Sequence, residues 1–138
     1  MTFIDTNHLN VKEPRAGWKG RFFHSQNMTF AYYAVAAGAW IYEHSHPNDE
    51  VWNVIDGELE IKIAAETQVA GPGCAVVVPP DTAHSVKALT DVRAIVVDYP
   101  KRYSIGGTEL LDYGCRSGPL APMSSAVVTA FTDPVMWF

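Results

Sequence analysis

The sequence has no clustered basic surface and no long apolar run, and these two absences exclude several classes of protein. Ten basic residues are scattered among fifteen acidic ones, and the net charge is −5. Without a basic stripe, binding to nucleic acid or to an anionic membrane is not expected. No segment approaches the ~20 apolar residues of a membrane helix, and the first residues lack the apolar core of a secretion signal. We therefore expect a cytoplasmic protein with neither nucleic acid nor membrane among its partners.

Cysteine and the motifs of covalent or nucleotide chemistry are also scarce. Cys74 and Cys115 are too few for a disulfide framework, and neither belongs to a closely spaced zinc-binding pair. Cys74 lies in an apolar run and is expected to be a buried thiol. A disulfide between the two stays open, although a reducing cytosol disfavours it. Because no nucleophile elbow and no phosphate-binding glycine loop is found, covalent and nucleotide-dependent chemistry are not expected.

Helical periodicity is hard to find, whereas the two-residue period of β-strands recurs along the chain. The segment ELEIKIAAE (58–66) alternates between apolar and charged residues, as a strand with one buried face does. The Asp56-Gly57 pair before it is a strong hairpin signal. Further strand-like segments lie at 28–38, 39–46, 50–55, 74–80, 84–89 and 92–100. These roughly seven or eight short strands predict an all-β fold, as a sandwich or barrel.

The length of 138 residues and the high hydrophobic content suit one packed domain. We expect the barrel at 28–100, preceded by an N-terminal arm at 1–27. Segment 101–138 is apolar but interrupted by glycine and proline, so we expect an irregular C-terminal tail that packs on the barrel or on a partner subunit. Three early aromatic residues also suit a subunit interface: Trp18, Phe22 and Phe23.

The stretch HSHPNDEVWNVIDG (44–57) places two histidines one residue apart and a glutamate four residues later. Alternate side chains of a strand point to the same side, so His44 and His46 project two imidazoles into one space. A proline-initiated turn can return the Glu50 carboxylate to that space, and His84 begins a later strand. We therefore expect three imidazoles and one carboxylate to converge inside the barrel.

Each of these residues also has an ordinary structural interpretation. A lone histidine is more often hydrogen-bonded or exposed than a metal ligand, and this is our interpretation of His8 and His24. A pair of histidines is weak evidence on its own. The spacing of the whole set is what favours a metal site.

The spacing resembles that of the cupin superfamily. Its first motif, G-x5-H-x-H-x3-E-x6-G, is matched at every fixed position, and its second, G-x5-P-x-G-x2-H-x3-N, at its first glycine, its proline and its histidine. The matching residues are Gly38, His44, His46, Glu50, Gly57, Gly73, Pro79 and His84. Asp81 stands where glycine is usual, in a turn conformation that aspartate tolerates, and Ala88 stands where asparagine is usual.

The resemblance implies a cupin-type double-stranded β-helix, or jelly-roll, barrel that holds one divalent metal. The implied ligands are His44, His46, Glu50 and His84. Three imidazoles and a carboxylate suit iron, manganese, nickel, zinc or copper (Fe, Mn, Ni, Zn or Cu) rather than calcium. Four protein ligands of an octahedral ion leave two positions for water or a small-molecule substrate. The resemblance also implies a homodimer.

Strand alternation predicts which side chains surround the ion. If the histidines of 44–46 face inward, Trp40 and Tyr42 should do so too, and Trp52 should follow Glu50. Tyr42 would then be the acid–base or hydrogen-bonding group nearest to the metal. Simple core packing is the alternative role for these aromatic residues.

Arg93 is a further candidate for the pocket, because it shares its strand face with Ile95 and Val97. If that face is inward, Arg93 would pair with a substrate carboxylate. A solvated arginine at the end of a strand is the alternative.

Open coordination positions in an aromatic cavity favour a metal-dependent enzyme that acts on a small oxygen-rich metabolite, with Glu50 and Tyr42 as candidate catalytic residues. Cupins of this size include dioxygenases, isomerases or cyclases, and lyases, and the sequence does not select among them. The shortage of acid–base groups favours an alternative, a non-catalytic cupin that binds a small molecule through its metal. A barrel that has lost its metal is a third hypothesis, and the complete ligand set argues against it.

Overall fold

The computed structural model describes residues 2–110 of the chain. Within this range the protein is built of β-strands, apart from the short 3-10 helix η1 (Thr6–His8). The strands are β1 (Lys12–Arg15), β2 (Trp18–His24), β3 (Thr29–Val35), β4 (Trp40–His44), β5 (Asp49–Asp56), β6 (Leu59–Ile63), β7 (Glu66–Ala70), β8 (Ala75–Val78), β9 (His84–Ala88), β10 (Val92–Tyr99), β11 (Ser104–Ile105) and β12 (Thr108–Glu109). The expected all-β fold is confirmed. Among residues 2–110, no helix is long and apolar enough to cross a membrane.

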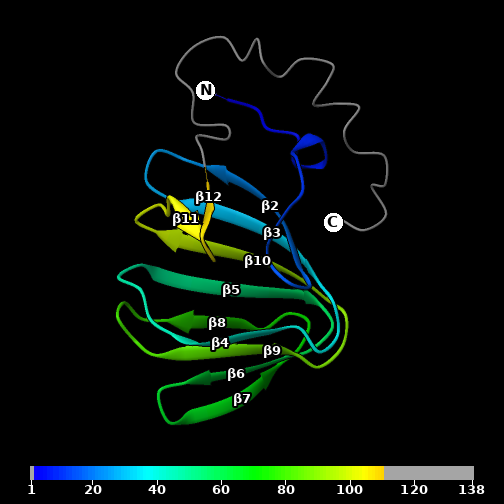
Figure 1. Ribbon diagram of the computed structural model, residues 1–138, viewed down its shortest axis with the longest axis vertical. Helices are drawn as coiled ribbons and strands as arrows, with labels where there is room; N and C mark the ends of the chain where they lie inside the picture. Colours follow the sequence, from blue (N-terminus) through cyan, green and yellow to red (C-terminus); the bar gives the residue numbers. More distant parts are fainter. Residues whose placement is uncertain (1, 111–138) are drawn as a thin grey trace.

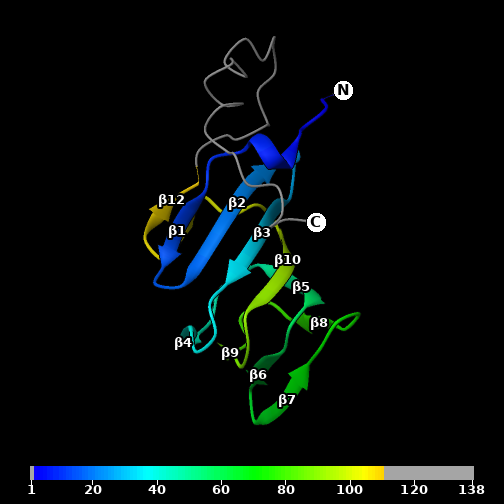
Figure 2. The same ribbon diagram turned by 90° about the vertical axis from the view of Figure 1, so that its right-hand side faces the viewer.

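Two antiparallel sheets make up the barrel (Figure 1). One has the strand order β1-β2-β3-β10-β5-β8 and the other β4-β9-β6-β7, while β11 and β12 form a separate short pair. Figure 2 shows β1, β2, β3 and β10 running side by side. Buried residues alternate with more exposed ones along β3 and β10, so every second side chain of these strands enters the interior.

The apolar core draws residues from both sheets. At its centre Trp18 meets Tyr33 and Trp52 edge to face, with ring centroids 5.7 and 5.8 Å apart. Trp18 and Phe22 are only 1% and 2% exposed, so the prediction that they form a subunit interface is wrong. Their strand, β2, lies inside the sheet and turns them into the core of their own chain.

Strand pairing extends on both sides of segment 28–100. β2 lies before residue 28, yet it pairs with β3 from Trp18 opposite Val35 to His24 opposite Thr29. After residue 100, β11 and β12 place Ile105 among the buried core residues. The remainder of the expected tail, 111–138, lies outside the described residues, as does Cys115.

Two turns differ from the sequence-based expectations. Asp56-Gly57 does not join paired strands, because β5 and β6 belong to different sheets, so the predicted hairpin is a corner between sheets. Gly57 has φ +81° there, and a side chain would collide with the Asp91 carbonyl oxygen. Cys74 is exposed rather than buried, because it lies in the turn before the edge strand β8.

Asp81 adopts the turn conformation that the sequence motif requires of its position. Its φ is +57°, in the left-handed region where glycine is the usual residue and aspartate is tolerated. The Asp81 backbone N–H donates a 2.8 Å hydrogen bond to the His46 carbonyl oxygen. This bond ties the turn before β9 to the loop after β4, and so joins the two segments that supply the histidines.

Candidate metal centre

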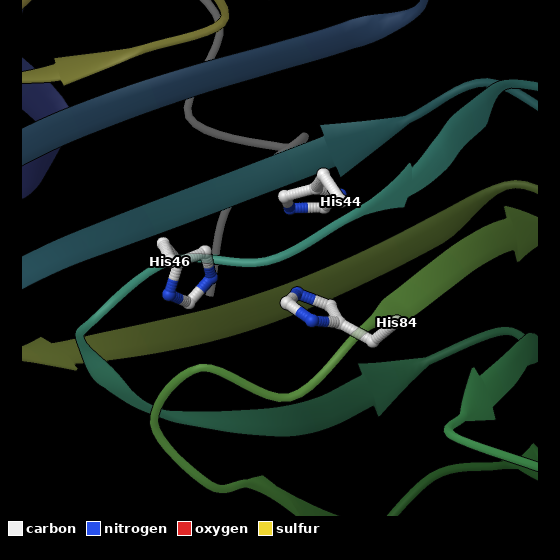
Figure 3. A group of neighbouring side chains, drawn as sticks. All are labelled: His44, His46 and His84. Atoms are coloured by element: carbon white, nitrogen blue, oxygen red, sulfur yellow. The ribbon is translucent and has the colours of Figure 1, made fainter.

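Four predicted ligands lie at neighbouring ends of three strands. His44 ends β4, His46 follows in the loop, Glu50 is the second residue of β5, and His84 begins β9 directly opposite His44. Figure 3 shows the three imidazole rings pointing toward one another. Their centroids are 4.3 Å apart for His44 and His84, 4.9 Å for His46 and His84, and 5.6 Å for His44 and His46. One potential ligand atom from each ring lies within 4.8 Å of the others.

Backbone carbonyls fix the orientation of all three rings. Each Nδ1 faces a carbonyl oxygen two residues away, and a carbonyl oxygen can only accept, so each Nδ1 carries the proton. The Nδ1···O distances are 2.8 Å from His44 to Tyr42, 3.2 Å from His46 to Asn48 and 2.8 Å from His84 to Thr82. When a ring with its proton on Nδ1 is neutral, its Nε2 atom presents a lone pair, which is how metal-binding histidines are held in proteins.

Glu50 places a carboxylate against these Nε2 atoms. It is 3% exposed, and its oxygens lie 3.3 Å from Nε2 of His46 and 3.5 Å from Nε2 of His84. Trp52 donates a 2.6 Å hydrogen bond from Nε1 to Glu50 Oε1. Burial favours the protonated acid, but His46 and His84 outweigh it and hold the pKa of Glu50 well below its usual range. Glu50 is therefore ionised at neutral pH.

The chemistry of this donor set fits a transition-metal ion. The Nε2 atoms of His46 and His84 are buried and have no hydrogen-bond partner among residues 2–110. Burial lowers the pKa of His44, which favours the neutral, metal-binding form of that ring. For His84 burial acts in the same direction, but the adjacent Glu50 carboxylate outweighs it and raises the pKa. A cation bound by three imidazole nitrogens and one carboxylate would accept the buried nitrogen lone pairs and balance the buried negative charge.

Three charged residues that the sequence did not single out join this cluster: Arg15, Asp98 and Arg102. Asp98 is 1% exposed and pairs across the sheet with Glu50, and burial together with the Glu50 charge raises its pKa to about 9. Arg102 Nη1 lies 3.6 Å from Glu50 Oε2. Strand alternation could have found Asp98, because it shares the inward face of β10 with Val96. For Arg15 and Arg102, no sequence pattern indicated a position in the cavity.

The expectation that Trp40 and Tyr42 face the interior is wrong. The two side chains are 50% and 71% exposed and lie against each other on the outer surface. A β-bulge in β4 is the reason: Ile41 and His44 are three residues apart, yet their partners on β9 are two apart. The extra residue reverses the alternation, so Ile41 takes the inward position in place of its neighbours.

The prediction that Arg93 faces the interior is also wrong, whereas Trp52 faces the cavity as expected. The inward face of β10 carries Val92, Ala94, Val96 and Asp98. Arg93 is on the other face, with Nη2 3.4 Å from Oδ2 of Asp56. Trp52 is 3% exposed and lines the cavity beside Glu50.

His8 and His24 are not part of the cluster. Nδ1 of His8 lies 3.3 Å from Asp5 Oδ2. His24 is buried and hydrogen-bonded through both ring nitrogens, to Thr29 Oγ1 at 2.8 Å and to the Leu110 carbonyl at 3.2 Å. Both histidines therefore have the ordinary structural roles that their isolated positions indicated.

Comparisons with known proteins agree with this fold. The family profile described as cupin domain matches residues 31–99, half of the 138-residue chain. The Streptomyces coelicolor protein SCO3923 is 33% identical over 81 residues, which cover 58% of this chain and 77% of that protein.

Solved structures resemble the chain at lower identity and show the fold alone. KdgF from a Halomonas species is 24% identical with a TM-score of 0.69, and the match covers 74% of this chain and 96% of KdgF. Oxalate decarboxylase of Bacillus subtilis, whose structure was studied for its Mn(II) centres, is 20% identical with a TM-score of 0.68. That match covers 80% of this chain and 32% of the decarboxylase. With the profile match over half its length, the chain belongs to the cupin family.

Proposed function

We propose that this cupin is a metal-dependent enzyme that acts on a small oxygen-rich metabolite. The observation that carries the proposal is the set of three imidazoles, each oriented by a backbone carbonyl, whose Nε2 atoms meet a buried, ionised carboxylate. His44, His46, His84 and Glu50 would hold one divalent ion of iron, manganese, nickel, zinc or copper. When bound, such an ion polarises a carbonyl or carboxylate oxygen and lowers the pKa of a bound water.

The surrounding side chains orient the ligands and exclude water. The Trp52 indole N–H occupies one side of Glu50 Oε1 and so fixes the carboxylate plane. Ile41, Trp52 and Val96 form apolar walls of the cavity, which strengthens electrostatic interactions inside it. A dry pocket with fixed ligands suits dioxygenase, isomerase or cyclase, and lyase chemistry on an oxygen-rich substrate.

Metal analysis tests the first half of the proposal. Protein purified without added metal should contain close to one equivalent of a single transition metal, and His46→Ala and His84→Ala should each reduce this to less than about a tenth. His8→Ala is the matched control, since His8 lies outside the cluster. A wild-type protein with less than about a tenth of an equivalent, or a content unchanged by His46→Ala, would contradict the proposal and favour a barrel without metal.

A non-catalytic metal-dependent binding protein is the second candidate. The observation that favours it is the outward position of Tyr42, which removes the acid–base group expected beside the metal. Oxygen-uptake, isomerase and lyase screens on the metal-loaded protein separate the two. Turnover that is lost in His46→Ala supports the enzyme, whereas saturable ligand binding without turnover supports the binding protein.

We also propose a homodimer formed through the outer face of β2 and β3. Phe23 stacks on Phe30 there with ring centroids 4.8 Å apart, and Tyr32 lies 6.0 Å from Phe23. The three rings are partly exposed, and aromatic residues are enriched in subunit interfaces. Light scattering after size exclusion should give twice the chain mass of 15.2 kDa, and a particle of 15.2 kDa would reject the dimer.

A further inference from the structure

Two arginines from distant parts of the chain line the same cavity as Glu50 and His44. Arg15 ends β1, and Arg102 follows β10 by three residues. The two segments are in contact, because Gly106 packs so closely against Pro14 and the Arg15 side chain that it has no room for a Cβ atom. The fold therefore brings two guanidinium groups to the cavity beside the metal cluster.

Buried hydrogen bonds hold the segment that carries Arg102. Its backbone N–H donates to Thr29 Oγ1 at 2.7 Å, and the same hydroxyl lies 2.8 Å from His24 Nδ1. Asn48 Nδ2 donates to the Pro100 carbonyl in the preceding turn. Thr29 is fully buried, so these bonds are shielded from water. The backbone position of Arg102 is therefore fixed by the fold, and its side chain starts from a defined point beside the cavity.

The balance of charge in the cavity indicates that the two arginines can bind an anion. The charged residues lining it, among those the structure describes, are Arg15, Glu50, Asp98 and Arg102. Even with both acids ionised, the two carboxylates only balance the two guanidinium groups. A divalent cation held by Glu50 and the histidines adds two positive charges that no described residue of the cavity compensates. Uncompensated buried charge is costly, and a bound anion removes that cost.

The two guanidinium groups also act on each other. Burial lowers the pKa of Arg15, and the positive charge of Arg102 adds to that lowering, while Tyr33 and Glu50 oppose it. Arg102 Nη1 lies 3.6 Å from Oε2 of Glu50. Because a metal ion would take that carboxylate as its ligand, Arg102 would lose much of its attraction for Glu50. A guanidinium fork pairs with a carboxylate through two parallel hydrogen bonds, so the pair is suited to a carboxylate ligand.

We propose that Arg15 and Arg102 form an anion subsite beside the metal centre, and that the substrate is a small metabolite carrying a carboxylate. This inference rests on the proposed function. The space between the lining side chains is about 10 Å³, enough for one water. A carboxylate is larger than this space, so its binding requires a lining side chain to move; in the proposal this is the Arg102 side chain, which turns from Glu50 to the substrate.

A pair of probes of equal size and different charge tests this subsite. Pyruvate carries a carboxylate, and pyruvamide replaces it with a neutral amide. Titration calorimetry on Mn(II)-loaded protein should give at least tenfold tighter binding of pyruvate than of pyruvamide. Arg15→Met and Arg102→Met should each remove most of this preference while metal content stays at one equivalent. Arg102→Lys, which retains the charge without the fork, should recover part of it.

The control is Arg93→Met, which removes an arginine that pairs with Asp56 on the outer face. It should leave the preference for pyruvate unchanged. Equal affinity for the two probes, or a preference that survives both Met variants, would overturn the anion subsite while leaving the metal centre intact. Tighter binding of inorganic phosphate than of pyruvate would overturn the assignment to a carboxylate. Wild-type protein that retains no metal would overturn the proposed function and this inference together.

Discussion

The barrel interior has two regions that are built on the same strands and contain different chemistry. Along β9, His84 belongs to the metal cluster, while Val86 and Ala88 are fully buried in the apolar core. Along β5, Glu50 belongs to the cluster and Val54 to the core. Core side chains need only close packing, whereas every buried polar group of the cluster needs a partner.

This difference separates stability from binding. The core side chains contribute to the folded state whether or not a ligand is present, because their stabilisation comes from removal of apolar surface from water. The cluster, by contrast, buries Nε2 atoms of His46 and His84 that have no hydrogen-bond partner among the described residues, and a bound ion would supply one. Substitutions in the two regions should therefore be distinguishable by what they change and by how much.

The largest loss of stability is expected in the core. Trp18→Ala should lower the free energy of unfolding by about 3–5 kcal/mol, because it removes a fully buried ring that contacts Tyr33 and Trp52. Urea unfolding followed by circular dichroism measures the change. Trp40→Ala, at a half-exposed position, is the matched control and should change it by less than about 1 kcal/mol. Similar losses for the two variants would contradict the assignment of core and surface.

The metal cluster should contribute through its ion. With free metal at 100 times its dissociation constant, wild-type unfolding should require about 2.7 kcal/mol more than unfolding of the metal-free protein. His46→Ala should lose this metal-dependent increment, whatever its stability without metal. Thermal or urea unfolding with and without the metal measures it, and His8→Ala should retain the full increment. An increment preserved in His46→Ala would place the ion elsewhere.

The carboxylate of the cluster can be neutralised with little change of shape. Glu50→Gln keeps an oxygen that can accept from Trp52 Nε1 and removes the charge, so metal affinity should fall by more than tenfold, or about 1.4 kcal/mol. Chelator competition measures the affinity. Glu60→Gln, on the exposed face of β6, is the control and should bind the metal as the wild type does. Unchanged affinity in Glu50→Gln would remove Glu50 from the ligand set.

The smallest effect is expected on the outer surface of β4. Tyr42→Phe should leave metal affinity and any turnover within about twofold of wild type, because Tyr42 is not among the residues that line the cavity and its ring is largely exposed. The His44 Nδ1 bond uses the backbone carbonyl of Tyr42 and survives the change. A tenfold loss of turnover would restore Tyr42 as a catalytic residue and contradict the bulge geometry.

The sequence predicted what depends on regular strand geometry and on turn residues. The alternation in β6 is borne out by buried Leu59 and Ile61 beside exposed Glu60 and Lys62. The spacing of the histidines and Glu50 predicted the four residues that the structure brings together. Asp81 in a left-handed turn was predictable from its position in the motif.

The remaining features depend on contacts that a local pattern does not contain. The bulge in β4 is defined by its pairing with β9, so Ile41 could not be assigned to the interior from its own segment. The turn at Ala64, with φ +52°, separates β6 from β7 without glycine or asparagine to mark it. Arg15 and Arg102 line the same cavity although they are far apart in the sequence, and their segments meet where Gly106 packs against Pro14 and Arg15.

The central claim is that one ion binds to Nε2 of His44, His46 and His84 and to the carboxylate of Glu50. X-ray absorption at the edge of the bound metal measures this shell directly. The account predicts nitrogen and oxygen ligands at about 2.0–2.2 Å. Outer-shell scattering should come from three imidazole rings in the wild type and from two in His84→Ala that has been loaded with added metal. A shell of oxygen alone, a sulfur ligand, or imidazole scattering unchanged by His84→Ala would contradict it.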